Sequence, residues 1–236
     1  MFVYIFSYNS FMQNKVDIEK QAIKYLKENK ELLFSSYLDK YFPMDEKVAY
    51  FTAGPSGAGK TEFIQQFLEV EQNLLHLDID TIRSFFASIG YDGSNSDIFQ
   101  KPASWGVQFL FDEAIKERNL SLVVDSNLSH FQTAKENMVK LLKQNYKIEI
   151  FYVYNDLEKC FLYTKKRESV TNRTVPEDVF FKSVVKSRST TYEIKKLFAK
   201  NITLNVIDKR DDSYYEDIDC QQFKEIIPVH TRIKND

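Results

Sequence analysis

The chain has 236 residues and a formal net charge of −2, with 43% hydrophobic and 28% charged residues. This length suits one well-buried domain, and the composition is globular rather than disordered or fibrous. The slightly acidic balance makes nucleic acid an unlikely partner, because a general electrostatic grip on phosphates needs an excess of positive charge. The two cysteines, Cys160 and Cys220, form no CxxC or Cys/His spacing, so we expect neither a disulfide framework nor a zinc site. This pattern fits a cytoplasmic protein.

The N-terminal residues 1–44 are expected to form a helical segment. Their first eleven residues, MFVYIFSYNSF, are apolar but too short to span a bilayer, and they lack the basic start and cleavage site of a signal peptide. We therefore predict no membrane segment. An amphipathic pattern over residues 16–39 follows Met12, which makes residues 1–11 a candidate for an upstream extension of the reading frame. N-terminal sequencing of the native protein tests this hypothesis.

Short apolar runs alternate with helical patterns through the rest of the chain. Strands are predicted at residues 47–54, 74–80, 120–127, 147–156 and 201–208. Helical patterns separate them at residues 60–70, 81–89, 104–118, 131–144, 156–169 and 176–199. This alternation predicts an α/β fold, a parallel sheet of about five strands with helices on both faces. Ligands of such sheets bind at the carboxyl ends of the strands.

The stretch GPSGAGKT, residues 54–61, stands between the first strand and the next helix and satisfies the GxxxxGK[ST] pattern. Its glycines permit backbone N–H groups to point at a phosphate, Lys60 is expected to bridge the β- and γ-phosphates, and Thr61 is expected to hold Mg²⁺. The nucleotide-binding residues predicted here are Gly54, Pro55, Ser56, Gly57, Ala58, Gly59, Lys60 and Thr61. The alternative is a plain strand-to-helix turn punctuated by glycines.

This phosphate loop assigns residues 45–210 to a P-loop NTPase or kinase-like domain that uses ATP and Mg²⁺, and leaves residues 211–236 as a C-terminal extension of unknown role. A switch GTPase would carry an NKxD element after a later strand, and no such element follows any predicted strand after the phosphate loop. A mechanical ATPase usually needs further domains, for which the chain has little room. A small-molecule kinase remains, and it requires an acceptor-side carboxylate, a second acidic site and mobile cations.

Asp80, in the stretch HLDIDTIR, is predicted to end the second strand, where an acceptor hydroxyl would meet the γ-phosphate. It is our candidate catalytic base, with Asp78 on the same strand face as the fallback. The alternative is that Asp80 caps a helix beginning at Thr81. Arg83, one turn further on, is a candidate ligand for a substrate phosphate or else a solvent-exposed side chain.

Asp125 ends the apolar run LSLVVD, which is the Walker B arrangement for Mg²⁺ or its coordinated water. The alternative is a loop aspartate that forms an Asx-turn with Asn127.

The stretch TKKRESVTNRTVPED, residues 164–178, is predicted to close over the phosphates. Arg167 ends one helix and Arg173 follows in a short loop, as expected of a lid that contacts phosphoryl oxygens and excludes water. Basic residues at a helix C-terminus also interact favourably with the helix dipole, which explains residues 165–167 well but Arg173 poorly.

Taken in order, GPSGAGKT, DIDTIR, LVVDSN and RESVTNRTVP resemble the zeta-toxin family of bacterial kinases over roughly residues 45–210. Members transfer the γ-phosphate of ATP to the 3′-hydroxyl of the sugar in UDP-N-acetylglucosamine, and many are held inactive by an antitoxin. The resemblance implies that Asp80 is the catalytic base, Lys60 the phosphate-loop lysine, and Arg167 and Arg173 the γ-phosphate arginines.

The turn after the third strand departs from the family. Well-studied members have a glutamate followed by a glycine- and threonine-rich turn with an arginine, whereas this chain has DSNLS at residues 125–129. That turn lies near the sugar in the family, so the resemblance places Asp125, Asn127 and Ser129 with Arg83 on the acceptor side.

We therefore predict a cytoplasmic kinase that phosphorylates a sugar nucleotide or related small molecule and has an antitoxin as a candidate partner. Two alternatives stay open: a polynucleotide 5′-kinase, and a nucleotide-binding interaction module with little turnover.

Overall fold

The computed structural model describes residues 2–171 and 175–230, and in that part of the chain the strands form one six-stranded sheet in the order β2-β3-β1-β4-β5-β6. The strands are β1 Val48–Ala53, β2 Leu75–Asp78, β3 Leu122–Asp125, β4 Lys147–Tyr154, β5 Thr203–Asp208 and β6 Ser213–Tyr215. β1 to β5 are parallel, and β6 pairs antiparallel with β5. The predicted α/β fold is confirmed. The sixth strand was not expected, because three residues at a sheet edge leave no apolar run to detect.

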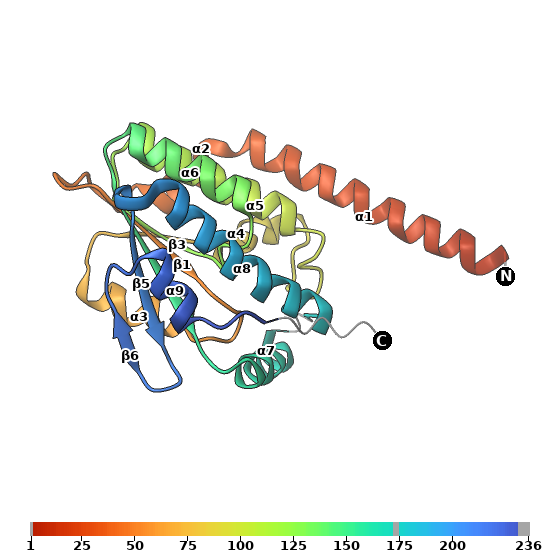
Figure 1. Ribbon diagram of the computed structural model, residues 1–236. Helices are drawn as coiled ribbons and strands as arrows, with labels where there is room; N and C mark the ends of the chain where they lie inside the picture. The colour runs from red at the N-terminus through yellow and green to blue at the C-terminus, as the bar shows by residue number, and fades with distance from the viewer. Residues whose placement is uncertain (1, 172–174, 231–236) are drawn as a thin grey trace.

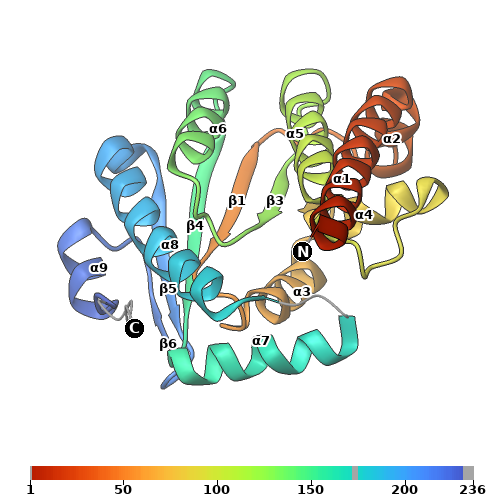
Figure 2. The same ribbon diagram turned by 90° about the vertical axis from the view of Figure 1, so that its right-hand side faces the viewer.

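Helices cover both faces of the sheet, and Figures 1 and 2 show α5 and α6 on one side and α3 on the other. The α-helices are α1 Phe2–Glu28, α2 Lys30–Leu38, α3 Lys60–Val70, α4 Ile79–Arg83, α5 Gln100–Lys116, α6 Phe131–Lys143, α7 Leu157–Thr171, α8 Glu177–Phe198 and α9 Cys220–Ile226. Two 3₁₀ helices, η1 Ser84–Ile89 and η2 Ala199–Asn201, complete the set. The helix predicted over residues 16–39 is interrupted at Asn29. None of the described helices is long and apolar enough to cross a membrane.

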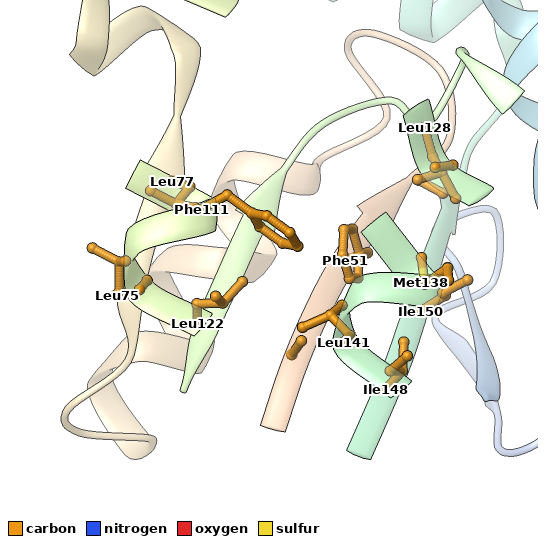
Figure 3. Packing of buried hydrophobic residues seen from close by; sticks show 14 of the residues in the cluster. Phe51, Leu75, Leu77, Phe111, Leu122, Leu128, Met138, Leu141, Ile148 and Ile150 are labelled. Atoms are coloured by element: carbon orange, nitrogen blue, oxygen red, sulfur yellow. The ribbon is translucent and has the colours of Figure 1, made fainter. Parts of the chain in front are cut away.

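The main hydrophobic core lies between the sheet and the helices α5 and α6. Figure 3 shows Phe51 of β1 between Phe111 of α5 and Met138 of α6, with Leu141 of α6 beneath it. All four side chains are at most 1% exposed. The alternate face of β1 turns Tyr50 toward Phe67 of α3, with ring centroids 4.8 Å apart. Burial of these two faces fixes β1 at the centre of the sheet, which in turn positions the loop that follows it.

Both ends of the chain contribute to this core. Leu26 of α1 and Leu33 of α2 are fully buried against it, whereas the N-terminal part of α1 extends beyond the α/β body (Figure 1). At the other end Phe223 of α9 is buried, and its ring meets Tyr152 of β4 edge-on at 5.1 Å. The C-terminal part of α1, α2 and α9 thus pack onto the predicted kinase domain.

A second, smaller core lies beneath the phosphate loop. It joins Ala58 of the loop, Val153 of β4, Cys160 of α7, and Phe180 and Val184 of α8. These side chains are at most 1% exposed. The loop is therefore packed directly against the two helices that flank the predicted lid.

Candidate active site

The phosphate loop, residues 54–61, follows β1 and leads into α3, as predicted. Gly54 has φ +118°, and a Cβ there would lie 2.1 Å from the carbonyl oxygen of Val153 in β4. Gly57 has φ +75°, and its Cβ would lie 2.2 Å from the carbonyl oxygen of Cys160 in α7. Only glycine fits at either position, because both the backbone angle and the space exclude a side chain. The loop is thereby held against β4 and α7.

Lys60, the first residue of α3, turns back into the loop. Its Nζ donates to the carbonyl oxygens of Gly54, at 3.0 Å, and Pro55, at 2.6 Å. Burial lowers the pKa of Lys60 to about 8, although the nearby charge of Asp125 acts in the opposite direction. The ammonium group is therefore positioned inside the loop and poorly solvated, where an anionic phosphate would compensate its burial.

This pKa predicts how nucleotide affinity changes with pH. Phosphate oxygens favour the charged ammonium, so the pKa of Lys60 in the complex must be higher than its value of about 8 in the free protein. Above that pH, binding takes up a proton and ATP affinity should fall by up to about tenfold per pH unit. Titration calorimetry in buffers of different ionisation enthalpy measures this uptake. A Lys60→Met variant should bind weakly and take up no proton, and equal proton uptake by both proteins would contradict the assignment.

Asp125, at the end of β3, is fixed by Thr52 of β1. The Thr52 hydroxyl lies 3.1 Å from Asp125 Oδ1 and 3.0 Å from the Ser126 carbonyl oxygen, and it accepts from the Ser126 backbone N–H at 3.0 Å. Burial raises the pKa of Asp125, and the neighbouring Lys60 opposes this shift. A cation bound beside Asp125 would favour its ionised form.

Removing the hydroxyl of Thr52 should destabilise this turn. Thr52→Val keeps the shape and the β propensity but leaves the Ser126 N–H without its acceptor, so we expect a loss of about 1–2 kcal/mol in the free energy of unfolding. Thr191→Val is the matched control, because that buried hydroxyl donates to a helix carbonyl, Ser187 O, and its loss strands no donor. Urea denaturation compares the two, and equal stability of Thr52→Val and the unmodified protein would exclude the role given to Thr52.

The predicted position of Asp80 at the end of the second strand was wrong. β2 ends at Asp78, and Asp80 is the second residue of α4. Asp78 is the N-cap: its carboxylate accepts from the backbone N–H groups of Asp80 and Thr81, both at 3.1 Å, and from the Thr81 hydroxyl at 2.9 Å. The capping role considered for Asp80 thus belongs to Asp78. Asp78 also pairs with Asp125 in the register of β2 and β3, which puts Asp80 just beyond the acidic edge of the sheet.

Asp80 lies between two arginines. Arg83, one turn along α4, donates to Asp80 Oδ1. Arg167 of α7 donates from Nη2 to Asp80 Oδ2 at 2.9 Å. The structure therefore brings together the predicted base and one predicted γ-phosphate arginine, although 87 residues separate them in sequence.

The solvent-exposed environment predicted as one alternative for Arg83 was wrong. Its side chain is 1% exposed, and besides Asp80 it contacts Oε1 of Gln100, the first residue of α5. A buried guanidinium in these contacts orients Asp80, and the role of Arg83 as a ligand for a substrate phosphate stays a prediction. A sequence pattern could not show this burial, because it results from α5 packing over α4.

The turn after β3 brings Asn127 and Ser129 together, with Ser129 Oγ donating to Asn127 Oδ1 at 3.3 Å. The Asx-turn considered for Asp125 is not the interaction that orders this turn; the Leu128 N–H donates instead to Ser126 Oγ at 3.2 Å. Leu128 is buried in the core with φ +48°. The turn is thus anchored on the carboxyl edge of the sheet, next to Asp125.

The C-terminal part of α7 is tied to Val175, two residues before α8 begins. Lys165 Nζ donates to Glu168 at 3.0 Å and to the Val175 carbonyl oxygen at 2.9 Å, and Glu168 accepts from the Val175 N–H. The Val175 N–H and Lys165 together lower the pKa of Glu168. These contacts hold the helix that carries Arg167. Arg173, the second predicted arginine, lies outside the described residues.

The residues present fit a Mg²⁺–nucleotide complex. A triphosphate needs close backbone N–H groups and a cation, which the loop at Gly54 and Gly57 and the ammonium of Lys60 supply. Magnesium needs oxygen ligands, which the hydroxyl of Thr61 in the first turn of α3 and the carboxylate of Asp125 supply. Within the described residues no group of three or more His, Cys, Asp or Glu side chains gathers to hold a metal alone. A magnesium ion here would share its ligands with the phosphates.

Several contributors to the site carry no sequence signal. Ser187 of α8 accepts from the Gly54 N–H at 2.9 Å. Thr52 fixes Asp125, Gln100 fixes Arg83, and Glu168 fixes the end of α7. Each acts through a contact with a residue more than six positions away or in another element. Only the tertiary structure reveals such partners.

The fold and the site define a P-loop kinase-like protein. The sequence profile of the zeta toxin family matches residues 35–219, which is most of the chain. The chain therefore belongs to the zeta toxin family, and the resemblance seen in its motifs is confirmed. A comparison with curated proteins gives no match.

Solved structures of similar fold include a protein of the PezAT chromosomal toxin–antitoxin system of Streptococcus pneumoniae, with 17% identity and a TM-score of 0.65 over 80% of this chain and 81% of that chain. A chain of the AvrRxo1-ORF1:-ORF2 complex with ATP has 14% identity and a TM-score of 0.63, covering 93% and 74%. A chain of the Pnkp1/Rnl/Hen1 RNA repair complex has 16% identity and a TM-score of 0.51, covering 75% and 49%. The TM-scores show a shared fold, and at these low identities the similarity shows the fold alone.

Proposed function

We propose that this protein is an ATP-dependent kinase that transfers the γ-phosphoryl group to a hydroxyl of a small cytoplasmic molecule, and that the acceptor is a nucleotide sugar such as UDP-N-acetylglucosamine. Membership of the zeta toxin family supports phosphoryl transfer. The observation that carries the proposal is the contact of Arg167 with Asp80, 2.9 Å between Nη2 and Oδ2. It brings a predicted phosphate ligand to a carboxylate beside the phosphate loop.

In the proposed reaction, Asp80 accepts the proton of the acceptor hydroxyl as that oxygen attacks the γ-phosphorus. The bond from the γ-phosphorus to the bridging oxygen breaks, ADP leaves, and the proton passes from Asp80 to solvent. Lys60 and Arg167, together with Arg173, neutralise charge on the phosphoryl oxygens. Mg²⁺, held by Thr61 and Asp125 with the phosphates, would supply further charge neutralisation.

We assign the chemistry to residues 45–210 and the acceptor contacts to the turn that carries Asn127 and Ser129. Hydrogen bonds within this turn hold it next to Asp125. It therefore lies at the carboxyl edge of the sheet, where an acceptor would meet the γ-phosphate. Residues 1–44 and 211–236 are proposed as supporting segments of this domain. An antitoxin is the proposed protein partner, since one similar structure comes from a toxin–antitoxin system.

The test is incubation of the purified protein with ATP, Mg²⁺ and UDP-N-acetylglucosamine, followed by mass spectrometry for a product that gains one phosphate. An oligonucleotide with a free 5′-hydroxyl serves as the parallel acceptor, because the fold is shared with a chain of an RNA repair complex. We expect the sugar nucleotide to be phosphorylated and the oligonucleotide to remain unchanged. Phosphorylation of the oligonucleotide alone would replace the proposal by a polynucleotide kinase, and binding of ATP without any transfer would favour an interaction module.

A further inference from the structure

The two arginines that hold Asp80 differ in how firmly they are held. Arg83 is 1% exposed, comes from the same helix as Asp80, and also contacts Gln100 of α5. Arg167 is 59% exposed and comes from α7. One carboxylate oxygen, Oδ1, therefore faces an enclosed cation, and the other, Oδ2, faces a cation at the surface.

The contact with Arg83 is expected to persist during the reaction. A guanidinium removed from water is strongly destabilised when it loses a carboxylate partner, so separating Arg83 from Asp80 would be unfavourable. The Gln100 contact fixes the other arm of the same guanidinium. Asp80 thus keeps its place and orientation whatever happens at Oδ2.

The contact with Arg167 is weak by comparison. An ion pair that water can reach contributes little, because water competes for its partners; here Arg167 is exposed and Asp80 is partly exposed. A terminal phosphate carries more negative charge than a carboxylate and offers several oxygens to a guanidinium. A γ-phosphate placed by the loop can therefore attract Arg167 away from Asp80, whereas the β-phosphate of ADP ends short of that position.

The contacts of Lys60 are similar in kind. Its ammonium donates to two carbonyl oxygens of the loop, Gly54 O and Pro55 O. Protein oxygens thus contact both Lys60 and Arg167. For Arg167, the protein oxygen is one that the proposed mechanism needs for the acceptor hydroxyl.

We propose that Asp80 and the γ-phosphate compete for Arg167, and that the exchange takes Arg167 away from Oδ2 of Asp80, so that the acceptor hydroxyl reaches this oxygen only after ATP has bound. The inference deepens the proposed function and rests on it. It gives the site an order, ATP before acceptor, and a means of distinguishing ATP from ADP. Asp80 is then both the base and the group that holds Arg167 until ATP arrives.

The experiment uses nucleotides alone, so it is independent of the acceptor. Calorimetry measures the affinity of the full chain for the β,γ-imido analogue of ATP and for ADP, each with Mg²⁺. The proteins are the unmodified chain, Asp80→Asn, Arg167→Ala and the double variant. Lys159→Ala, an exposed lysine on the same helix, controls for the loss of one positive charge.

Asp80→Asn is expected to bind the ATP analogue about two- to fivefold more tightly, the range that an exposed ion pair contributes, with a smaller change for ADP. In the Arg167→Ala background, Asp80→Asn should give no such gain, because the competition has been removed. Lys159→Ala should show the same gain from Asp80→Asn as the unmodified chain.

An equal gain in both Arg167 backgrounds, or an equal gain for ADP and the analogue, would show simple charge repulsion by Asp80 and overturn the exchange. No gain at all would also overturn it. These outcomes differ from failure of the proposed function, which would appear as absence of nucleotide binding or absence of phosphoryl transfer in the unmodified protein. Thermal unfolding of each variant confirms that the compared proteins are folded.

Discussion

Asp80→Asn is expected to lower phosphoryl transfer by between about 10²- and 10⁴-fold, the range associated with loss of a general base. Asparagine keeps the size of the side chain and can still accept from Arg83 through its amide oxygen, with a loss of stability because the buried guanidinium loses its charged partner. It cannot take the proton of the acceptor hydroxyl. ATP should still bind, because the phosphate loop and Lys60 are unchanged. Initial rates with saturating ATP, together with a nucleotide titration, measure both properties.

Asp78→Asn is the matched control for this substitution. Asp78 has the same side chain two residues earlier, but its carboxylate is used to cap α4. Asparagine is as good an N-cap as aspartate, so the free energy of unfolding should fall by less than about 1 kcal/mol, with a much smaller loss of transfer than for Asp80→Asn. If Asp78→Asn removed activity and Asp80→Asn kept it, the base would have to be reassigned to Asp78.

The second large effect is expected at Gly54, where alanine should abolish nucleotide binding and lower the free energy of unfolding by more than about 3 kcal/mol. A Cβ would lie 2.1 Å from the Val153 carbonyl oxygen, with φ at +118°. The Val153 oxygen belongs to the backbone and cannot rotate away as a flexible side chain could. The clash can therefore be relieved only if β1 and β4 separate or the loop moves. Either response displaces the backbone N–H groups that would contact the phosphate.

Gly90→Ala serves as the control that separates the two effects expected at Gly54, the steric clash of the added Cβ and the unfavourable backbone angle. Gly90 has φ +101°, but nothing lies within 4 Å of the position that its Cβ would take. We expect a cost of about 1–2 kcal/mol, from the backbone conformation alone. Chemical denaturation of both variants gives the comparison, and similar losses would show that packing of the loop against β4 contributes little.

Local patterns were sufficient to predict the five parallel strands and the phosphate loop, but not β6. The five parallel strands are buried apolar runs with clear ends, and the loop of residues 54–61 has a glycine spacing that the backbone geometry at Gly54 and Gly57 explains. The polar residues at the strand ends do meet at one edge, where Asp78 pairs with Asp125. Parallel strands impose this convergence, so it follows from the order of elements.

The environment of each side chain could not be predicted in the same way. Both Asp78 and Asp80 are compatible with a strand end or a helix cap, and the choice depends on where β2 stops pairing with β3. The local sequence gives no sign that Arg83 is buried, yet α5 covers it and supplies Gln100 as a partner. The contact between Asp80 and Arg167 depends on how α7 lies over the sheet edge, which no local pattern records.

The most direct test of the account uses ATP that carries heavy oxygen in its γ-phosphate. The unmodified protein and Asp80→Asn are each incubated with this ATP, Mg²⁺ and a bacterial metabolite extract, and the small molecules are analysed by mass spectrometry. The account predicts one predominant metabolite that gains a labelled phosphate with the unmodified protein and that is reduced at least about 100-fold with Asp80→Asn. Release of the label only as inorganic phosphate, or equal labelling by both proteins, would contradict it.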